Sequence, residues 1–207
     1  MKPSQKTIVI TEPNILIVEG DEDKMFFEAL IQHLGLRRIQ VMPIGGKTQL
    51  RPNLRSLCNL EGFPTRVRSL GIIRDADDDP QAAFQSVRGA LQSVNLPVPD
   101  RPLVRVGSNP SVAVMMVPDI NTPGALEDLC LQAVDNDRAK PCVEQYFDCL
   151  KQRGLLPKNI SKAKIQAFLA SRLEAGKRLG EAAQAGYWPW DSSAFDQLKK
   201  FLQIIVT

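Results

Sequence analysis

The first part of the chain alternates between short aliphatic runs and segments with apolar residues at helical spacing. Residues 15–18 are four consecutive aliphatic positions, which is typical of a central parallel strand covered by helices on both faces. Residues 21–34 carry apolar side chains at helical spacing, and Gly35 follows as a common C-terminal stop. The pattern therefore predicts a strand followed by a helix.

The same alternation continues along the chain. We expect a second strand within residues 38–46, a helical segment interrupted by a proline over 47–63, and a third strand with an acidic end over 67–79. Residues 80–94 have an apolar stripe and begin with Pro80, which is favoured in the first turn of a helix. The order strand, helix, strand, helix, strand, helix predicts an α/β fold.

The second part of the chain changes character. Residues 103–107 and 111–118 are predicted as two further strands that could pair as a hairpin, and from Thr122 onward the pattern is helical. We expect a mainly parallel central sheet flanked by helices, with a helical C-terminal portion. The predicted division is an α/β domain over residues 1–135 and a helical extension over 136–207 that packs on the same domain.

Composition narrows the class of protein. The chain has 207 residues, 43% of them hydrophobic, a net charge of +3 and a pI near 8.7. A chain of this length and hydrophobic content can bury one main core. The small net positive charge is compatible with nucleic acid binding but gives no specific evidence for it. The apolar runs are too short to cross a bilayer and the N-terminus lacks a signal-peptide core, so we expect a soluble, cytoplasmic protein with no membrane partner.

The cysteines and the histidine exclude several kinds of chemistry. The four cysteines contain no C-x-x-C pair and lie in segments with apolar periodicity, which favours buried free thiols over a disulfide framework or a zinc site. His33 is the only histidine and lies in a helical pattern, where a surface or half-buried position is expected. Its isolation argues against Ser-His-Asp or Cys-His catalysis.

Acidic residues follow two of the predicted buried strands. Glu19 ends the first strand, and Asp75 and Asp77 end the third. Because ligands of open α/β sheets bind beyond the carboxyl ends of the strands, we expect these carboxylates at one edge, with Asp75 and Asp77 facing the same side. Two ionised carboxylates about 4 Å apart repel by about 4 kcal/mol at a protein surface. A shared proton or a divalent cation would offset this, and oxygen ligands without histidine or thiolate favour Mg²⁺ or Mn²⁺.

Other acids have a purely structural explanation. Asp21 and Glu22 complement the dipole of the helix that they begin, and Asp79 is well placed to cap the helix that starts at Pro80. Caps do not explain acids that emerge from two separate buried strands, so the metal-site interpretation is kept for Glu19, Asp75 and Asp77.

These motifs resemble the Toprim domain, which is shared by topoisomerases, bacterial primases, small RNA-maturation nucleases and OLD family nucleases. The matching segments are "ILIVEGDED", which contains Glu19, and "GIIRDAD", which contains Asp75 and Asp77. The resemblance implies a Rossmann-like Toprim fold and adds Asp23 and Glu127 as further metal-site acids. By their position in OLD-like proteins, Lys162 or Lys164 would neutralise developing negative charge, although an ordinary solvated helix lysine remains the alternative.

The resemblance implies a Mg²⁺- or Mn²⁺-dependent phosphodiester hydrolase that acts on DNA or RNA. Asp75 and Asp77 would hold the metal, and Glu19 would bind a second ion or act as general base. The chain is too short for the breakage domain of a topoisomerase, and it lacks the ATPase domain of OLD nucleases, so an ATP-driven partner would be a separate protein. Two alternatives stay open: a non-catalytic module that binds metal, nucleic acid or a protein partner, and a nucleotidyl transferase. Strand preference and oligomeric state are left open.

The basic residues suggest no single surface from sequence alone. "PIGGKT" ends like a phosphate-binding loop, but Val41 stands where its first glycine should be, so we interpret the segment as a glycine turn that brings Lys47 near the acidic edge. Further cations that could contact phosphate are scattered along the chain: Arg51, Arg55, Arg66, Arg68, Arg74, Arg172, Lys177 and Arg178.

Overall fold

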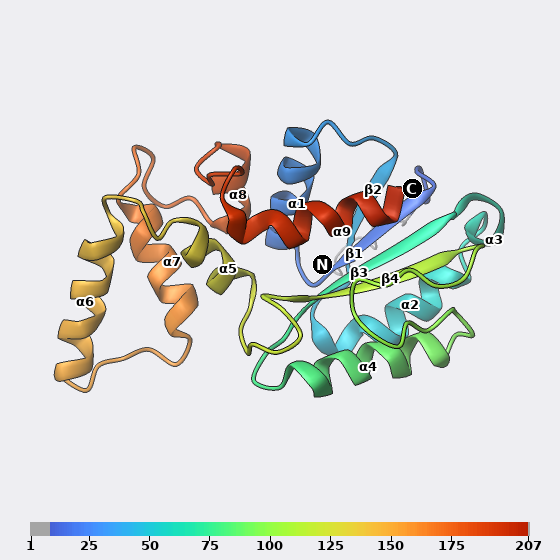
Figure 1. The fold of residues 1–207 in the computed structure, drawn as a ribbon, viewed down its shortest axis with the longest axis horizontal. Helices are drawn as coiled ribbons and strands as arrows, with labels where there is room; N and C mark the ends of the chain where they lie inside the picture. Colours follow the sequence, from blue (N-terminus) through green and yellow to red (C-terminus); the bar gives the residue numbers. More distant parts are fainter. Residues whose placement is uncertain (1–8, 207) are drawn as a thin grey trace, which may run out of the picture.

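A four-stranded, entirely parallel sheet lies at the centre of the computed structural model, which describes residues 9–206 (Figure 1). The strands are β1 (Asn14–Val18), β2 (Ile39–Pro43), β3 (Ser69–Asp75) and β4 (Ser111–Val117), in the order β2, β1, β3, β4. Because every pairing is parallel, the carboxyl ends of all four strands lie at the same edge of the sheet.

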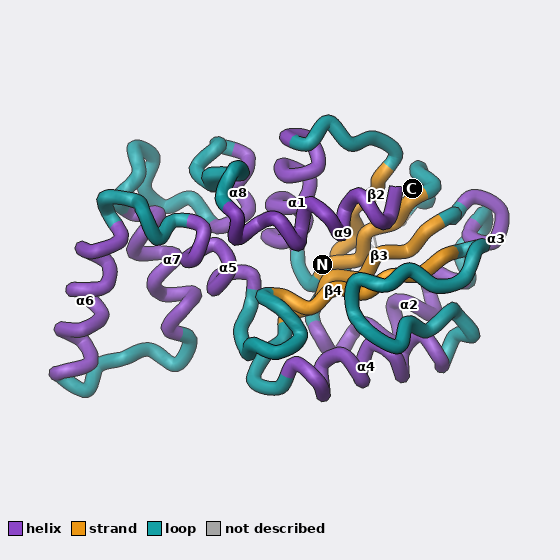
Figure 2. The backbone as a smooth tube through the Cα atoms, in the orientation of Figure 1, coloured by secondary structure: helices purple, strands orange, loops and turns teal. Residues whose placement is uncertain are grey.

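Helices cover both faces of this sheet, and a second group of helices extends beyond it (Figures 1 and 2). The helices are α1 (Asp21–His33), α2 (Leu50–Cys58), α3 (Phe63–Arg66), α4 (Pro80–Gln92), α5 (Leu126–Ala133), α6 (Lys140–Gln152), α7 (Ile160–Ala170), α8 (Leu179–Gln184) and α9 (Asp196–Val206), with 3-10 turns η1 (Lys47–Gln49) and η2 (Ser193–Phe195). The mixed α/β architecture with a helical C-terminal part confirms the predicted fold class.

The aliphatic run of β1 is buried on both sides, as its continuous pattern predicts. Leu16 and Val18 belong to a core that they share with α1, α5 and α9, whereas Ile15 and Ile17 belong to the core on the α2 and α4 side. Successive side chains of a strand point to opposite faces, so a central strand needs apolar residues at every position.

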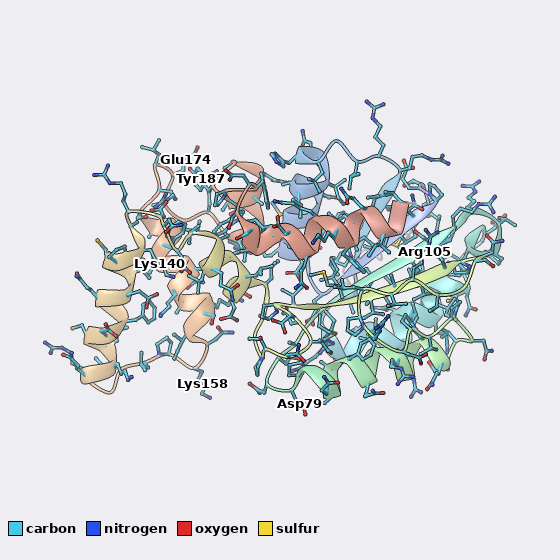
Figure 3. The ribbon with its side chains drawn as sticks, in the orientation of Figure 1. Asp79, Arg105, Lys140, Lys158, Glu174 and Tyr187 are labelled. Atoms are coloured by element: carbon cyan, nitrogen blue, oxygen red, sulfur yellow. The ribbon has the colours of Figure 1, made fainter. Side chains whose placement is uncertain are left out.

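The C-terminal helix α9 completes one face of the sheet. Gly71 of β3 permits this close packing, because a Cβ atom there would lie 2.8 Å from a methyl carbon of Ile205. The end of α9 is also held by hydrogen bonds: Ser69 Oγ donates to the carbonyl of Ile205, and Arg105 Nη1 donates to that of Ile204 at 3.3 Å (Figure 3).

Helix starts follow the predicted capping chemistry. Asp79 accepts a hydrogen bond of 3.0 Å from the backbone N–H of Ala82, and it lies at the beginning of α4 (Figure 3). This confirms the predicted N-cap and explains an acidic residue directly before Pro80.

Two expectations about the rest of the fold, one on a strand and one on the cysteines, are wrong. Residues 103–107 form no strand, because Leu103 adopts a left-handed φ of 62° and only Val106 makes an isolated antiparallel bridge, to Val112. Cys142 and Cys149 are exposed rather than buried, since α6 turns Val143 and Phe147 into the core instead. Within residues 9–206, none of the helices combines the length and the apolar character that a membrane span requires.

Candidate functional site

Glu19 and Asp75 meet at the carboxyl edge of the sheet. Their strands, β1 and β3, are neighbours, and the backbone N–H of Asp75 donates to Glu19 Oε1 at 3.4 Å. Two acids that are 56 positions apart in the sequence are therefore brought together. The topology of the parallel sheet is the cause, as the sequence pattern predicts.

Asp75 is a half-buried carboxylate that the start of α5 holds in place. Its Oδ1 accepts a hydrogen bond of 3.1 Å from the backbone N–H of Leu126, the first residue of α5. Burial, followed by the negative charges of Glu19, Asp23 and Glu127, raises the pKa of Asp75 well above its usual value. The ionised form of the Asp75 carboxylate is therefore destabilised, and the one hydrogen bond from Leu126 only partly offsets this.

Asp23 connects this acidic cluster to helix α1. Its Oδ2 accepts a hydrogen bond of 2.7 Å from the backbone N–H of Gly20, the N-cap of the helix. Burial and then the charges of Glu19 and Glu127 raise its pKa to about 6, against the opposing effect of the Gly20 hydrogen bond. Asp23 thus caps its own helix and also faces the other acids.

These acids line a large groove of about 1170 Å³. We call it the acidic groove and define it by six carboxylates and three cations on its walls: Glu19, Asp21, Glu22, Asp23, Asp75, Glu127, Lys162, Lys177 and Arg178. Glu127 enters it from the first turn of α5 and Lys162 from α7. A groove of this size with both cations and carboxylates among its lining residues suits a phosphorylated ligand.

Asp77 departs from the predicted arrangement. It has a left-handed φ of 52°, and its backbone exchanges hydrogen bonds of 2.9 and 2.8 Å with Gly124. Its carboxylate pairs with Arg74 Nη2 at 2.9 Å and with Lys47 Nζ at 3.3 Å, and it does not line the acidic groove. The expectation that Asp75 and Asp77 face the same side is wrong, because the backbone turns between them.

Arg74 is the site residue whose pairing with the acids sequence reasoning missed, although it was counted among the scattered cations. It is 4% exposed, and its Nε lies 2.6 Å from Glu19 Oε1, an ion pair that lacks the alignment of a hydrogen bond. Burial raises the pKa of Glu19, and the Arg74 charge partly opposes this effect. The available signal was a cation inside the otherwise apolar strand segment "LGIIRD", since a buried charge needs a partner.

The two candidate lysines lie in different places. Lys162 lines the acidic groove, as the carboxylates do. Lys164 forms a close ion pair with Glu144 of α6 and lies over the ring of Phe147, 5.8 Å from its centroid. Lys164 does not line the groove, and the catalytic role of either lysine stays a prediction.

The donor set of the groove fits a hard divalent cation in its chemistry, because it consists of carboxylate oxygens. Their spacing is looser than in a formed metal site. Within residues 9–206, no three acidic, histidine or cysteine side chains stand close enough to hold one ion together. Metal binding would therefore require the carboxylates to move toward one another.

A comparison of the sequence with models of known protein families gives the family of this chain. A family model described as "Protein of unknown function (DUF3226)" matches residues 13–207. The chain belongs to this DUF3226 family. The comparison with curated proteins found no match for the DUF3226 chain.

A solved structure shares the fold. The DUF3226 chain is similar to the C-terminal region of the Burkholderia pseudomallei OLD protein, with a TM-score of 0.54 and 16% sequence identity. The similarity covers 95% of this chain and 98% of that one, so both have the same extent. At this identity the likeness shows a common fold, which includes the helical C-terminal part.

Proposed function

We propose that this DUF3226 protein is a metal-dependent phosphodiester hydrolase that acts on a nucleic acid strand in the acidic groove. The observation that carries the proposal is that Glu19, Asp23, Asp75 and Glu127 line the same groove, where burial and the charges of the other three raise the pKa of Asp75. Proteins rarely assemble uncompensated carboxylates unless a cation or a proton neutralises them. The OLD-like fold supports a nuclease-related function.

Asp75, Glu127 and Asp23 would hold Mg²⁺ or Mn²⁺, and Glu19 would take part as a further ligand or as a proton acceptor for water. The metal, when bound, would stabilise the charge that develops on the phosphate oxygens. The α5 N-terminus fixes Asp75 through the Leu126 N–H, which keeps its second oxygen available. Lys162 faces the same groove and would attract and orient the phosphate group.

A nuclease assay across metals and substrates tests this function. Supercoiled plasmid, single-stranded DNA and RNA would each be incubated with Mg²⁺ or Mn²⁺. We expect cleavage by the wild type and a loss of about 100-fold or more in Glu19→Gln and Asp75→Asn. Asp78→Asn is the matched control, because Asp78 is exposed and does not line the groove. A wild type that cleaves none of these substrates with either metal contradicts the proposal.

One observation favours a second candidate function, a non-catalytic module that binds metal, nucleic acid or a protein partner. Arg74 already pairs with Glu19 and Asp77, two of the five acids that the Toprim resemblance assigns to the metal site. An internal cation in this place reduces the need for a bound metal. This alternative predicts that Mg²⁺ raises the thermal stability or that nucleic acid binds, without any product being formed.

A further inference from the structure

A second cavity lies near the acidic groove, beside α2 and α4. It has a volume of about 450 Å³ and we call it the basic pocket. Its lining residues are Lys47, Thr48, Leu50, Arg51, Arg74, Ser86, Gly89 and Ala90. The residues of α4 at this wall are small, which leaves the space open: a Cβ atom at Gly89 would meet no atom within 4 Å.

Three cations converge on this pocket from separate elements. Lys47 comes from η1, Arg51 from α2 and Arg74 from β3. Asp77 pairs with Lys47 and Arg74, and Glu19 also pairs with Arg74, whereas Arg51 has no ion pair within residues 9–206. Positively charged side chains that face one cavity repel one another. An anion bound between them adds attractive interactions that outweigh this repulsion.

Arg74 supplies the second, independent observation. It is 4% exposed, and its Nη1 is buried without a hydrogen-bond partner within residues 9–206. A buried guanidinium N–H that lacks an acceptor is energetically unfavourable, because it has lost its hydrogen bonds to water without gaining a protein partner. Because Nη1 has almost no exposed surface in this conformation, the Arg74 guanidinium would have to turn toward the pocket that it lines for a phosphate oxygen to become its acceptor. Guanidinium groups bind phosphate with favourable geometry.

The loop after β2 separates the two cavities. Gly45 and Gly46 line the acidic groove, and the next residues, Lys47 and Thr48, line the basic pocket. Both glycines have positive φ, 76° and 96°, so the loop follows a path that residues with side chains rarely adopt. A nucleic acid strand that crosses this loop would have one phosphate on each side of it.

We propose that the basic pocket binds a phosphate group of a nucleic acid strand whose neighbouring phosphodiester lies in the acidic groove. The placement of the neighbouring phosphodiester rests on the proposed function, whereas the phosphate binding itself does not. Arg51 and Lys47 would contact phosphate oxygens from the open side, and Arg74 would do so from the floor of the pocket. This assigns a role to three cations that the sequence left scattered.

Metal-free binding tests the proposal separately from cleavage. A fluorescently labelled single-stranded oligonucleotide of twelve thymidines would be titrated with protein in EDTA at several salt concentrations. We expect Arg51→Ala to weaken binding about 5- to 10-fold and to reduce the slope of log K against log salt by about 0.7, the value for one lost contact to a single strand. Arg153→Ala is the matched control, since Arg153 is an exposed arginine that lines neither the basic pocket nor the acidic groove.

A second variant, Gly89→Glu, is chosen to fill the pocket at a position where an added Cβ atom meets no other atom within 4 Å. Gly89→Glu places a carboxylate in the open space, and it should weaken oligonucleotide binding at least as much as Arg51→Ala while the thermal unfolding midpoint is kept. Equal binding and equal salt slopes for wild type, Arg51→Ala and Gly89→Glu would overturn the proposal. Arg51-dependent binding of inorganic phosphate without binding of the oligonucleotide would also overturn it, because the ligand would then be a free anion. Binding without cleavage supports this site and contradicts only the hydrolase function.

Discussion

Arg74 Nε lies 2.6 Å from Oε1 of Glu19, so the acid that ends β1 is paired with a cation buried at the end of β3. The same guanidinium contacts Asp77 through Nη2 at 2.9 Å. One buried charge therefore connects the two acidic motifs that the sequence made conspicuous. Its removal would leave Glu19 without its cation, and Asp77 would keep only Lys47.

We predict that Arg74→Met lowers the free energy of unfolding by about 2 kcal/mol. Loss of one partner of a fully buried pair costs about 3 to 5 kcal/mol, and the value here is smaller because the Glu19 and Asp77 side chains stay partly exposed, at 20% and 37%. Urea denaturation monitored by circular dichroism gives the difference. Arg55→Met, on an exposed face of α2, should change stability by less than about 0.5 kcal/mol. Equal losses in both variants would show that the buried pair adds nothing.

The sequence predicted those parts of the architecture that depend on the spacing of hydrophobic residues and on the parallel order of the strands. The unbroken aliphatic run of β1 predicts a strand covered on both faces, and the parallel order of the sheet places Glu19 beside Asp75. Both results follow from local pattern and from the geometry of parallel sheets. No knowledge of individual contacts is needed to reach them.

The remaining features depend on side-chain directions that one sequence does not specify. Asp77 turns away from Asp75 because its backbone pairs with Gly124 in a left-handed conformation, which a D-x-D pattern does not reveal. Lys164 pairs with Glu144 because α6 packs against α7, and this long-range contact is invisible to periodicity. Arg74 was recognised only as one of many cations, since its two partners lie on different segments.

We predict that, without divalent metal, stability falls as the pH rises from about 4 to about 6. Burial raises the pKa of Asp23 from 3.8 to about 6, so in this range the folded state binds more protons than the unfolded state. The stability that protonated Asp23 provides is complete below about pH 4 and is lost as the pH passes 6. The shift corresponds to about 3 kcal/mol at neutral pH.

Asp23→Asn isolates this effect, because an amide oxygen can still accept the hydrogen bond from the Gly20 N–H. In EDTA, the variant should be more stable than the wild type at pH 8 and about equally stable at pH 4. Chemical denaturation at both pH values measures the difference. Asp78→Asn serves as the exposed control and should follow the wild-type curve. Parallel curves for Asp23→Asn and wild type would contradict the role assigned to Asp23.

We predict that Mg²⁺ or Mn²⁺ stabilises the wild type at pH 7.5 and not Asp75→Asn. A ligand at 100 times its dissociation constant adds about 2.7 kcal/mol to the free energy of unfolding. Asp75→Asn should be more stable than the wild type in EDTA, because it removes a buried carboxylate whose pKa burial has raised. It should gain nothing from the metal, because a ligand has been lost. Thermal unfolding with and without metal distinguishes the variants, and a metal response equal to that of wild type in Asp75→Asn would exclude Asp75 as a ligand.

We predict that Gly71→Ala destabilises the protein by about 1 to 3 kcal/mol through overpacking between β3 and α9. The added methyl group would lie 2.8 Å from Ile205 Cγ2 and 3.2 Å from Leu16 Cδ1, so the C-terminal helix would have to shift away from the sheet. Gly89→Ala is the matched control. It lies inside α4 with open space around its Cβ position, and alanine should stabilise that helix by up to about 1 kcal/mol. Urea denaturation of both variants measures these opposite signs, and a neutral Gly71→Ala would mean that α9 is not packed tightly against the sheet.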